Sequence, residues 1–290
     1  MSMSNSENKS QVGKVWFITG ASSGFGRLLA EHLFTLGANV VATARNIDTL
    51  SEFTTKHPAN SLILSLDVTK PDSIAKAHDD AIAHFGRIDV LVNNAGYGLT
   101  GAIEEVTDEE FMPMFDTNVL GLIHVTKAFL PDFRKQHSGN IVNISSIAGL
   151  VGSPGWGYYN ATKFAVEGIS DALTVEMEPF GVHVTVIEPG PFRTDFLGRS
   201  GKEAALQIAD YQPTAGKTRE YFHTQAGKQA GDPQKAVEAI VAAVSAPNPP
   251  KRLLLGKFAL NRFRGKIDAM QKEIAEWETT TIGADFPEGS

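Results

Sequence analysis

The feature that most constrains the fold is a repeated alternation of short apolar runs with longer segments of helical spacing. The runs are rich in Val, Ile and Leu and do not alternate with polar residues, which is typical of strands buried on both faces. We expect strands at Val15–Thr19, Asn39–Ala44, Leu62–Leu66, Val90–Asn93, Asn140–Ser145, His183–Glu188 and Arg252–Leu255. Helices are expected at Gly24–Leu36, Ser73–Phe85, Glu109–Lys135, Tyr158–Pro179 and Pro233–Ala246. This order predicts a single α/β domain, a doubly wound parallel sheet of about seven strands with helices on both faces.

Three segments fall outside this alternation. Residues 1–11 and 279–290 are expected to be flexible tails on either side of a domain at 12–278. The stretch Thr194–Asp232 is rich in glycine and lacks the apolar alternation. Long excursions of this kind are often binding loops, so we expect a loop-rich lid with short helices over a substrate site.

Composition excludes several classes of function. The net charge of −7 leaves no basic excess to neutralise phosphates, which argues against a nucleic-acid-binding protein. The absence of cysteine excludes disulfides, thiolate nucleophiles and Cys-ligated metals, and the 8 histidines show no metal-ligand spacing. No apolar run approaches the roughly 18 residues of a membrane span, and no secretory signal is present. We therefore expect a cytoplasmic protein without a metal.

A glycine-rich turn follows the first expected strand. Gly20, Gly24 and Gly26 stand at the spacing G-x-x-x-G-x-G, and a helix is expected immediately afterwards. Glycines at such positions permit a tight turn, close approach of the backbone to a pyrophosphate, and close packing of helix on strand. The N–H groups that begin the helix also favour a phosphate. A plain structural turn is the alternative, but the position at the first strand–turn–helix favours nucleotide binding.

Tyr159 and Lys163 are four residues apart, so they share one face of the expected helix Tyr158–Pro179. A phenol near pKa ~10 is a poor acid or base at neutral pH, and a neighbouring ammonium favours phenolate and lowers that pKa. The pair therefore predicts a group that moves a proton. Tyr158 is the rival, but the residue four positions after it is Thr162, and we expect Tyr158 in a pocket wall or a subunit contact.

The sequence resembles the short-chain dehydrogenase/reductase family over roughly residues 13–256. The family's motifs T-G-x-x-x-G-x-G, N-N-A-G, S…Y-x-x-x-K and P-G-x-x-x-T match, in that order, Thr19–Gly26, Asn93–Gly96, the set Ser146, Tyr159 and Lys163, and the set Pro189, Gly190 and Thr194. The resemblance implies a Rossmann-like fold, a nicotinamide cofactor, and hydride transfer between that cofactor and a carbonyl or alcohol.

The resemblance also implies which residues hold the cofactor. They are Gly20, Ser22, Ser23, Gly24, Phe25, Gly26, Arg45, Asp67, Val68, Asn94, Ala95, Gly96, Tyr159, Lys163, Pro189, Gly190 and Thr194. Asp67 and Val68 are expected to bracket the adenine. Asn93 and Gly96 are expected to border the adenine ribose, with Asn93 in part a structural hydrogen-bonding residue, and Thr194 is expected to reach the nicotinamide carboxamide.

The end of the second expected strand predicts NADP(H) as the cofactor. A carboxylate there would bind the ribose hydroxyl of NAD and repel the 2′-phosphate of NADP. Relatives that prefer NAD place Asp where this chain has Ala44, and the adjacent Arg45 can pair with a phosphate. A solvated surface role for Arg45 is the alternative. Asp48 opposes the prediction, but we interpret it as the N-cap of a helix that begins near Thr49.

The same resemblance assigns four catalytic residues. Tyr159 exchanges the proton, and Ser146 donates a hydrogen bond to the substrate oxygen, an oxyanion-type role. Lys163 also binds the nicotinamide ribose. Asn118 is expected to hold a water that links Lys163 to solvent, with a plain helix-surface or kink residue as the alternative. Ser145 is expected to be structural, because adjacent strand residues point to opposite sides.

Apolar side chains near these motifs predict a bulky lipophilic ketone, aldehyde or secondary alcohol as the substrate. They are Leu99, Val151, Trp156, Tyr158, Phe196, Leu197, Leu206, Tyr211, Tyr221 and Phe222. The alternative is that the aromatic residues only pack the lid onto the body. Relatives often pair through their long helices, which implies a homodimer or homotetramer. Rival functions are an NAD-linked alcohol dehydrogenase and a non-catalytic regulator that senses NADP(H).

Overall fold

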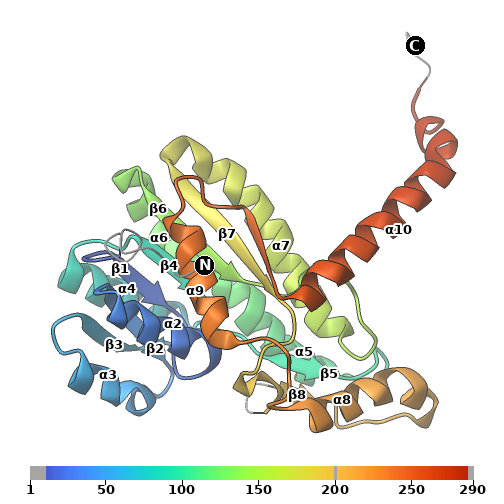
Figure 1. Cartoon of the computed structure of the whole chain (residues 1–290), viewed down its shortest axis with the longest axis horizontal. Coiled ribbons are helices and arrows are strands. Elements are labelled where there is room, and N and C mark those ends of the chain that lie inside the picture. The colour runs from blue at the N-terminus through green and yellow to red at the C-terminus, as the bar shows by residue number, and fades with distance from the viewer. Residues whose placement is uncertain (1–10, 199–200, 287–290) are drawn as a thin grey trace.

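A seven-stranded parallel sheet forms the centre of the computed structural model, which describes residues 11–198 and 201–286 (Figure 1). In spatial order its strands are β3 (Ser61–Ser65), β2 (Asn39–Ala44), β1 (Val15–Ile18), β4 (Val90–Asn93), β6 (Gly139–Ile144), β7 (Val182–Pro189) and β9 (Arg252–Leu255). Each strand begins and ends within one residue of its expected position. The predicted α/β doubly wound architecture is confirmed.

Helices cover both faces of this sheet. One face carries α2 (Gly24–Thr35), α3 (Ser51–Lys56) and α9 (Pro233–Ser245), and the other carries α4 (Pro71–Phe85), α6 (Leu122–Gln136) and α7 (Gly157–Met177). Strand β1 shows why its sequence does not alternate. Trp16 and Ile18 belong to the core under the first face, whereas Val15 and Phe17 belong to the core under the second. Both sides of the strand are buried, so both must be apolar.

The helix expected at Glu109–Lys135 is divided. Helix α5 (Asp108–Phe115) is followed by a π-helical segment at Asp116–Gly121, which leads into α6. Pro113 lies inside α5 and has no N–H to donate, and its carbonyl accepts a hydrogen bond from the hydroxyl of Thr117 at 2.9 Å. Wider turns of this type often occur at functional sites, and this one contains Asn118.

The interpretation of Asp48 as a helix cap is wrong. The short helical turn Ile47–Leu50 is capped by Asn46, whose side-chain oxygen accepts a hydrogen bond from the Asp48 backbone N–H at 3.0 Å. Asn is as good an N-cap as Asp, and Asn46 is the residue with extended backbone before the turn. The turn therefore begins two residues earlier than expected.

The stretch Thr194–Asp232 contains more regular structure than expected. Strand β8 (Gly201–Glu203) pairs in parallel with β5 (Gly98–Thr100), so the stretch is attached to the body through a two-stranded sheet. Helix α8 (Lys217–Gln225) follows. Neither strand was predicted, since three-residue strands give too little pattern to detect.

The C-terminal helix α10 (Lys257–Ile282) extends away from the rest of the molecule (Figure 1). No helix was predicted there, and the segment 279–290, expected to be a flexible tail, begins as helix. Most of the other expected tail, 1–11, lies outside the described residues. Its last residue, Gln11, is buried and accepts a hydrogen bond from the indole of Trp16.

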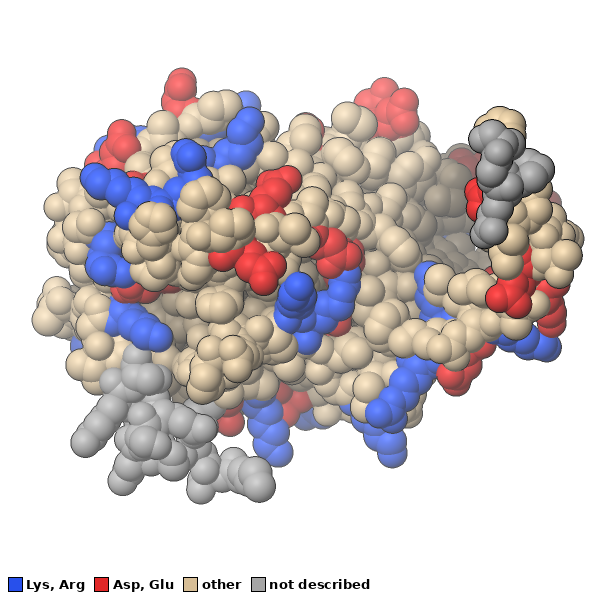
Figure 2. Space-filling model, turned by 90° about the horizontal axis from the view of Figure 1, so that it is seen from above, with Lys and Arg blue, Asp and Glu red and all other residues tan. Residues whose placement is uncertain are grey.

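The surface carries charges of both signs. Figure 2 shows basic and acidic side chains interspersed over one face, without a continuous basic area. Within the described part of the chain, no helix is long and apolar enough to cross a membrane.

Candidate active site

A cavity of about 1230 Å³ opens at the carboxyl ends of β1, β4, β6 and β7. It lies where the strand order reverses between β1 and β4, the position at which doubly wound sheets bind ligands. Of the residues expected to bind cofactor or substrate oxygen, those that line it are Gly20, Ser22, Ser23, Gly24, Phe25, Arg45, Asp67, Val68, Asn94, Ala95, Gly96, Ser146, Tyr159, Lys163, Pro189, Gly190 and Thr194. Gly26 and Asn118 do not line it. No cluster of His, Asp or Glu in residues 11–198 and 201–286 is arranged to hold a metal ion.

The glycine-rich turn has the backbone geometry that the motif requires. Gly20 has φ of +68° and Gly24 has φ of +56°, a conformation that favours glycine. Gly26 is different, because it faces the protein and not the cavity. A Cβ placed on it would lie 2.6 Å from the carbonyl oxygen of Gly20 and closer still to the amide nitrogen of Asn94. Gly26 therefore allows α2 to pack closely on the turn, and it does not line the cavity.

Asn94 joins this turn to the end of β4. Its side-chain Nδ2 donates to the carbonyl oxygens of Thr19 and Gly20, both at 2.9 Å. The Thr19 hydroxyl in turn accepts from the backbone N–H groups of Asn94 and Ala95. The two segments that shape the floor of the cavity are thus held together by four hydrogen bonds.

Asn93 does not border the cavity. Its side chain is 4% exposed and donates to the hydroxyl of Thr126 and to the side-chain oxygen of Asn143, each at 2.9 Å. Of its two expected roles, the structural hydrogen bonding is observed, whereas the side chain does not reach the cavity wall where the adenine ribose was expected. Successive strand residues point to opposite faces, so Asn93 faces the core while Asn94 faces the cavity.

The start of α2 fits a phosphate group. Ser23 is the N-cap residue, and its side chain makes no capping hydrogen bond. The first N–H groups of the helix therefore have no side-chain cap, and Ser22, Ser23 and Gly24 line the cavity beside them. A helix start with unpaired N–H groups and a glycine-lined approach suits a dinucleotide pyrophosphate.

The end of the cavity beside β2 and β3 is lined by polar and charged residues that would suit an adenosine group. Arg45 lines it together with Asn46 and Thr49, so no carboxylate follows β2 in the wall. Asp67 lines the opposite side, but its Oδ1 already accepts hydrogen bonds from the N–H and hydroxyl of Thr69. Burial opposes ionisation of Asp67, but these bonds and the charges of Arg45 and Lys70 outweigh it and hold its pKa below the usual value.

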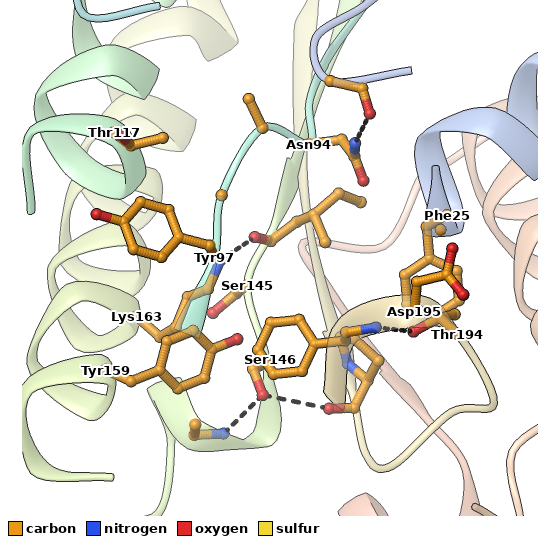
Figure 3. Close-up of a pocket in the computed structure, with 18 of the residues that line it drawn as sticks. Phe25, Asn94, Tyr97, Thr117, Ser145, Ser146, Tyr159, Lys163, Thr194 and Asp195 are labelled. Carbon is orange, nitrogen blue, oxygen red and sulfur yellow. Dashed lines mark hydrogen bonds between the residues drawn. The ribbon is translucent and has the colours of Figure 1, made fainter. Parts of the chain in front are cut away.

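Ser146, Tyr159 and Lys163 converge at the other end of the cavity (Figure 3). Ser146 follows β6, whereas Tyr159 and Lys163 lie one turn apart on α7. The Ser146 hydroxyl accepts a hydrogen bond from the N–H of Ala148 at 3.1 Å and donates to the carbonyl of Pro189 at 3.5 Å, and it lies on the same side of the cavity as the phenol of Tyr159. Lys163 Nζ donates to the carbonyl of Ile144 at 2.7 Å and lies 5.7 Å from the centroid of the Tyr159 ring.

Burial controls the ionisation of both groups on α7. It raises the pKa of Tyr159 well above that of a free phenol, although the nearby Ser146 hydroxyl acts in the opposite direction. This is contrary to the expectation that a neighbouring ammonium lowers the pKa of this phenol. Burial also lowers the pKa of Lys163 to about 8, while the nearby carboxylate of Glu167 acts to raise it. The low dielectric surroundings disfavour both charged forms.

A buried ionic network lies behind Lys163. Glu167, one turn further along α7, and Glu188 on β7 both pair with Arg252 of β9, which also binds Asp171. Ser145, in front of this network, is buried and lines the cavity together with Ser146, contrary to the expectation that only one of the two faces it. Burial and the charge of Glu167 raise the pKa of Glu188 to about 7. The network connects α7 to the strand that precedes α10.

Asn118 lies beside the cavity, behind its wall. Its Oδ1 accepts from the backbone N–H of Tyr97 at 3.0 Å, and its Nδ2 donates to the Tyr97 carbonyl at 2.8 Å and to the hydroxyl of Thr162 at 3.2 Å. The side chain is 2% exposed. Asn118 thus fixes the segment after Gly96 against α7, next to Lys163.

The substrate end of the cavity is only partly as expected. Val151, Trp156, Phe196 and Tyr221 line it. The expected residues Leu99, Tyr158, Leu206, Tyr211 and Phe222 do not, and nothing is described of the Leu197 side chain. The ring of Tyr158 packs on Phe111, and the buried Phe222 packs behind Trp156.

Several lining residues were not predicted, among them Lys202, Lys217, Thr218, Gln229, Phe258 and Arg262. Phe192 also lines the cavity, inside the P-G-x-x-x-T motif that was expected beside the nicotinamide. Phe258 and Arg262 come from α10, and no local pattern shows that this helix begins beside the cavity. Arg262 donates to the carbonyl of Gly152 and the hydroxyl of Ser153, both at 3.1 Å.

One buried ion pair fastens α8 to the body. Glu105 accepts from Arg219 of α8 at 2.6 Å and from the N–H groups of Ala102 and Ile208. Neither charged side chain reaches solvent appreciably, with 0% exposure for Glu105 and 6% for Arg219. The pair holds the helix that carries Lys217, Thr218 and Tyr221 over the cavity.

Comparison with known proteins identifies the family. The model of the family described as short chain dehydrogenase matches residues 14–205. The chain belongs to the short-chain dehydrogenase/reductase family. Members are oxidoreductases that act on alcohol or carbonyl groups with a nicotinamide cofactor, NAD or NADP.

Similar proteins of this family include several with informative names. The chain is 34% identical to the oxidoreductase BOA17 of Botryotinia fuckeliana, over 93% of this chain and 99% of that protein. It is 38% identical to a 3-ketodihydrosphingosine reductase of Bacteroides thetaiotaomicron, over 84% and 88%. It is also 38% identical to mouse 17-beta-hydroxysteroid dehydrogenase type 1, over 86% and 74%.

Solved structures of short-chain dehydrogenases agree with this fold. A short-chain dehydrogenase from Streptomyces avermitilis superposes with a TM-score of 0.89 at 40% identity, covering 94% of this chain and 99% of its own. A Burkholderia phymatum enzyme in complex with NAD has a TM-score of 0.80 at 25% identity and covers 91% and 96%. A metagenomic oxidoreductase in complex with NADP has a TM-score of 0.67 at 25% identity and covers 85% and 98%.

Proposed function

We propose that the chain is an NADP(H)-dependent carbonyl reductase whose general acid is Tyr159. The observation that carries the proposal is the convergence of the Ser146 hydroxyl, the Tyr159 phenol and the Lys163 ammonium in the cavity that the glycine-rich turn also lines. A plain nucleotide sensor would require the turn but not these three groups together.

The chain's own groups perform the proton transfer. When bound, the nicotinamide supplies the hydride to the carbonyl carbon. Ser146 donates a hydrogen bond to the carbonyl oxygen, on which negative charge develops. Tyr159 gives its proton to the same oxygen, and Lys163, fixed by the carbonyl of Ile144, stabilises the phenolate that remains. Because burial raises the Tyr159 pKa, the phenol holds its proton at neutral pH, which suits reduction.

The wall after β2 supports NADP(H) over NAD(H). Arg45 lines the cavity where a carboxylate would select NAD, and Ala44 beside it carries no charge. The planar guanidinium suits a 2′-phosphate. Asp48 does not line the cavity, so it does not oppose this assignment.

The substrate end supports a lipophilic carbonyl compound. Trp156, Phe196 and Tyr221 supply aromatic walls, and Val151 adds an aliphatic one. Two relatives are named for a keto or hydroxyl group on a sphingoid or steroid, which agrees with a large apolar substrate. The cations Lys217 and Arg262 lie in the same wall, so a polar group on the substrate is compatible with it.

The test is reduction of carbonyl compounds graded in size and polarity, with NADPH and NADH in parallel. We expect kcat/KM to be highest for bulky apolar ketones or aldehydes, and at least tenfold higher with NADPH than with NADH. Equal values for the two cofactors would make the chain an NAD-linked dehydrogenase. Absence of turnover with every compound, together with tight NADPH binding, would favour the regulator.

Tyr159→Phe separates catalysis from binding. It removes the proton donor and leaves the ring, so kcat should fall by about 10³-fold while the NADPH Kd changes less than threefold. Tyr158→Phe is the matched control, because that hydroxyl makes only a long hydrogen bond to the carbonyl of Ile103. Retained turnover in Tyr159→Phe would reject the assignment.

A further inference from the structure

Among residues 11–198 and 201–286, nothing packs against helix α10 along most of its length. It follows Gly256, which has φ of +90°, and contains 26 residues. Its first turns contact the body, but every residue from 267 to 282 is exposed (Figure 1). Helices in proteins owe most of their stability to packing of an apolar face. A helix of this length in water therefore indicates that its apolar face packs on something else.

The exposed part of α10 carries one narrow apolar stripe. Phe263, Ile267, Met270, Ile274 and Trp277 follow one another at intervals of four, three, four and three residues. Phe263 is half-buried against the body, whereas the last four are 38%, 47%, 63% and 63% exposed. Alternating intervals of four and three define the a and d positions of a coiled coil, in which two such stripes interlock.

The charges beside the stripe favour pairing with a second copy of the chain. Lys266 and Glu273 are seven residues apart, so both occupy the same flank. When two copies of α10 run antiparallel with Ile267 opposite Met270, Lys266 of each copy lies near Glu273 of the other. In a parallel pair, Glu273 would instead face Glu278, a repulsive contact. Two copies of α10 therefore match each other, in their apolar stripes and in the charges beside them, when they run antiparallel.

The same antiparallel register matches the apolar residues along the whole stripe. It places Phe263 opposite Ile274 and Leu260 opposite Trp277, each contact occurring twice by symmetry. A two-fold contact of this kind closes on itself and produces a dimer. A helix lying on a membrane would instead need a broad apolar face with basic flanks, whereas this stripe is narrow and has Glu273 and Glu278 beside it.

We propose that α10 is a dimerisation arm that pairs antiparallel with α10 of a second copy. The pairing has a consequence for the cavity. The base of α10 supplies Phe258 and Arg262 to the cavity wall, and the register lays the Trp277 end of the second helix on that base. Each copy would then cover the α10 side of the other copy's cavity, separately from any contact through α6 and α7.

The first experiment measures the mass of the full chain in solution by light scattering and sedimentation across micromolar concentrations. Ile274→Glu places a charge in the stripe and should halve the mass, with the association Kd raised at least tenfold. Ala275→Glu is the matched control, since it adds the same charge one residue away on the exposed outer side, and it should retain the wild-type mass. Circular dichroism checks that both variants are folded.

A charge exchange tests the direction of pairing. Lys266→Glu and Glu273→Lys should each weaken association, and the double variant should restore it, because the antiparallel pair then regains two opposite-charge contacts. Lys266 also lies over the ring of Phe164 at 5.1 Å, and restoration by the double variant distinguishes the contact between copies from that local one. Equal weakening in the double variant would overturn the antiparallel register.

Two results would overturn the proposal as a whole. One is a wild-type mass of a monomer at every concentration, and the other is an unchanged mass for Ile274→Glu. Cosedimentation with phosphatidylserine vesicles completes the test. Vesicle binding by a monomeric chain, lost in Ile274→Glu, would assign the stripe to a membrane surface and reject the dimer.

Discussion

The two ends of the cavity are built in different ways. The cofactor end consists of backbone turns at the ends of adjacent strands, held by short local motifs such as Gly20–Gly26 and Asn94. The substrate end consists of side chains from separate segments, among them Trp156, Tyr221 of α8 and Phe258 of α10. A binding site made from backbone demands particular residues at fixed spacings. A site made from side chains demands only a shape, which many sequences can supply.

Among the variants that separate the two ends, the largest effect is expected at the cofactor end. Gly26→Ala places a methyl group 2.6 Å from the Gly20 carbonyl and against the amide of Asn94. We expect α2 to shift and the NADPH Kd to rise at least 100-fold, measured by calorimetry or fluorescence. Gly168→Ala on α7 is the control, because its Cβ would meet no atom within 4 Å, and Ala in an exposed helix adds about 0.5–1 kcal/mol of stability. Similar behaviour of the two variants would contradict this account of the turn.

At the substrate end, Glu105→Ala leaves Arg219 buried without its carboxylate. Breaking a buried pair costs about 3–5 kcal/mol, and α8 should detach from the body. We expect the KM for the carbonyl substrate to rise at least tenfold and α8 to become sensitive to protease, with the NADPH Kd within twofold of wild type. Glu104→Ala, which removes only an exposed contact with Tyr211, should change neither. A parallel loss of cofactor affinity in Glu105→Ala would show that the two ends are not independent.

Arg45→Ala examines selectivity within the cofactor end. Loss of a charged hydrogen bond to the 2′-phosphate should lower kcat/KM for NADPH about tenfold and leave the value for NADH within twofold. Lys70→Ala removes a nearby cation that does not line the cavity and should affect neither cofactor. Equal losses for both cofactors would assign Arg45 to general folding stability.

The smallest effect near neutral pH is a pH dependence of the reduction. Lys163 is charged below its pKa of about 8 and loses its proton as pH rises through that value. Tyr159 remains protonated over the same range, because its pKa is raised. We therefore expect kcat/KM to fall twofold near pH 8 and about tenfold per unit above it. Glu167→Gln removes a charge that favours the ammonium, so it should move the decline to lower pH. Glu176→Gln, exposed on the same helix, should not.

The difference between local and long-range structure also explains which features could be predicted from the sequence. The seven strands of the central sheet were predicted within one residue because most of them are buried on both faces. Tyr159 and Lys163 were singled out by their spacing and Ser146 by the family resemblance, and all three line the cavity. Where two nearby residues have similar side chains, the sequence pattern could not decide which of them takes a given role. It could not show that Asn93 faces the core, nor that Asn46 caps the turn in place of Asp48.

The remaining differences depend on long-range structure. Strands β5 and β8 are three residues each and exist only because Gly98–Thr100 and Gly201–Glu203 meet across the fold. The π-helical segment at Asp116–Gly121 leaves no periodic signal. The α10 stripe does have a heptad spacing in the sequence, but nothing in the spacing shows that the base of the helix reaches the cavity.

The hydrogen bonds of Asn94 have a consequence for how the protein acquires its cofactor site. Asn94 and the Thr19 and Gly20 carbonyls that it binds are separated by 75 and 74 residues of chain. The turn is therefore incomplete on a nascent chain until β4 has been synthesised and has docked beside β1. Contacts of such sequence separation form slowly, because they close long loops. The cofactor can therefore bind only after β1 and β4 have docked, and it cannot guide the early steps of folding. Its binding to the folded chain should raise the unfolding temperature of the whole domain by mass action.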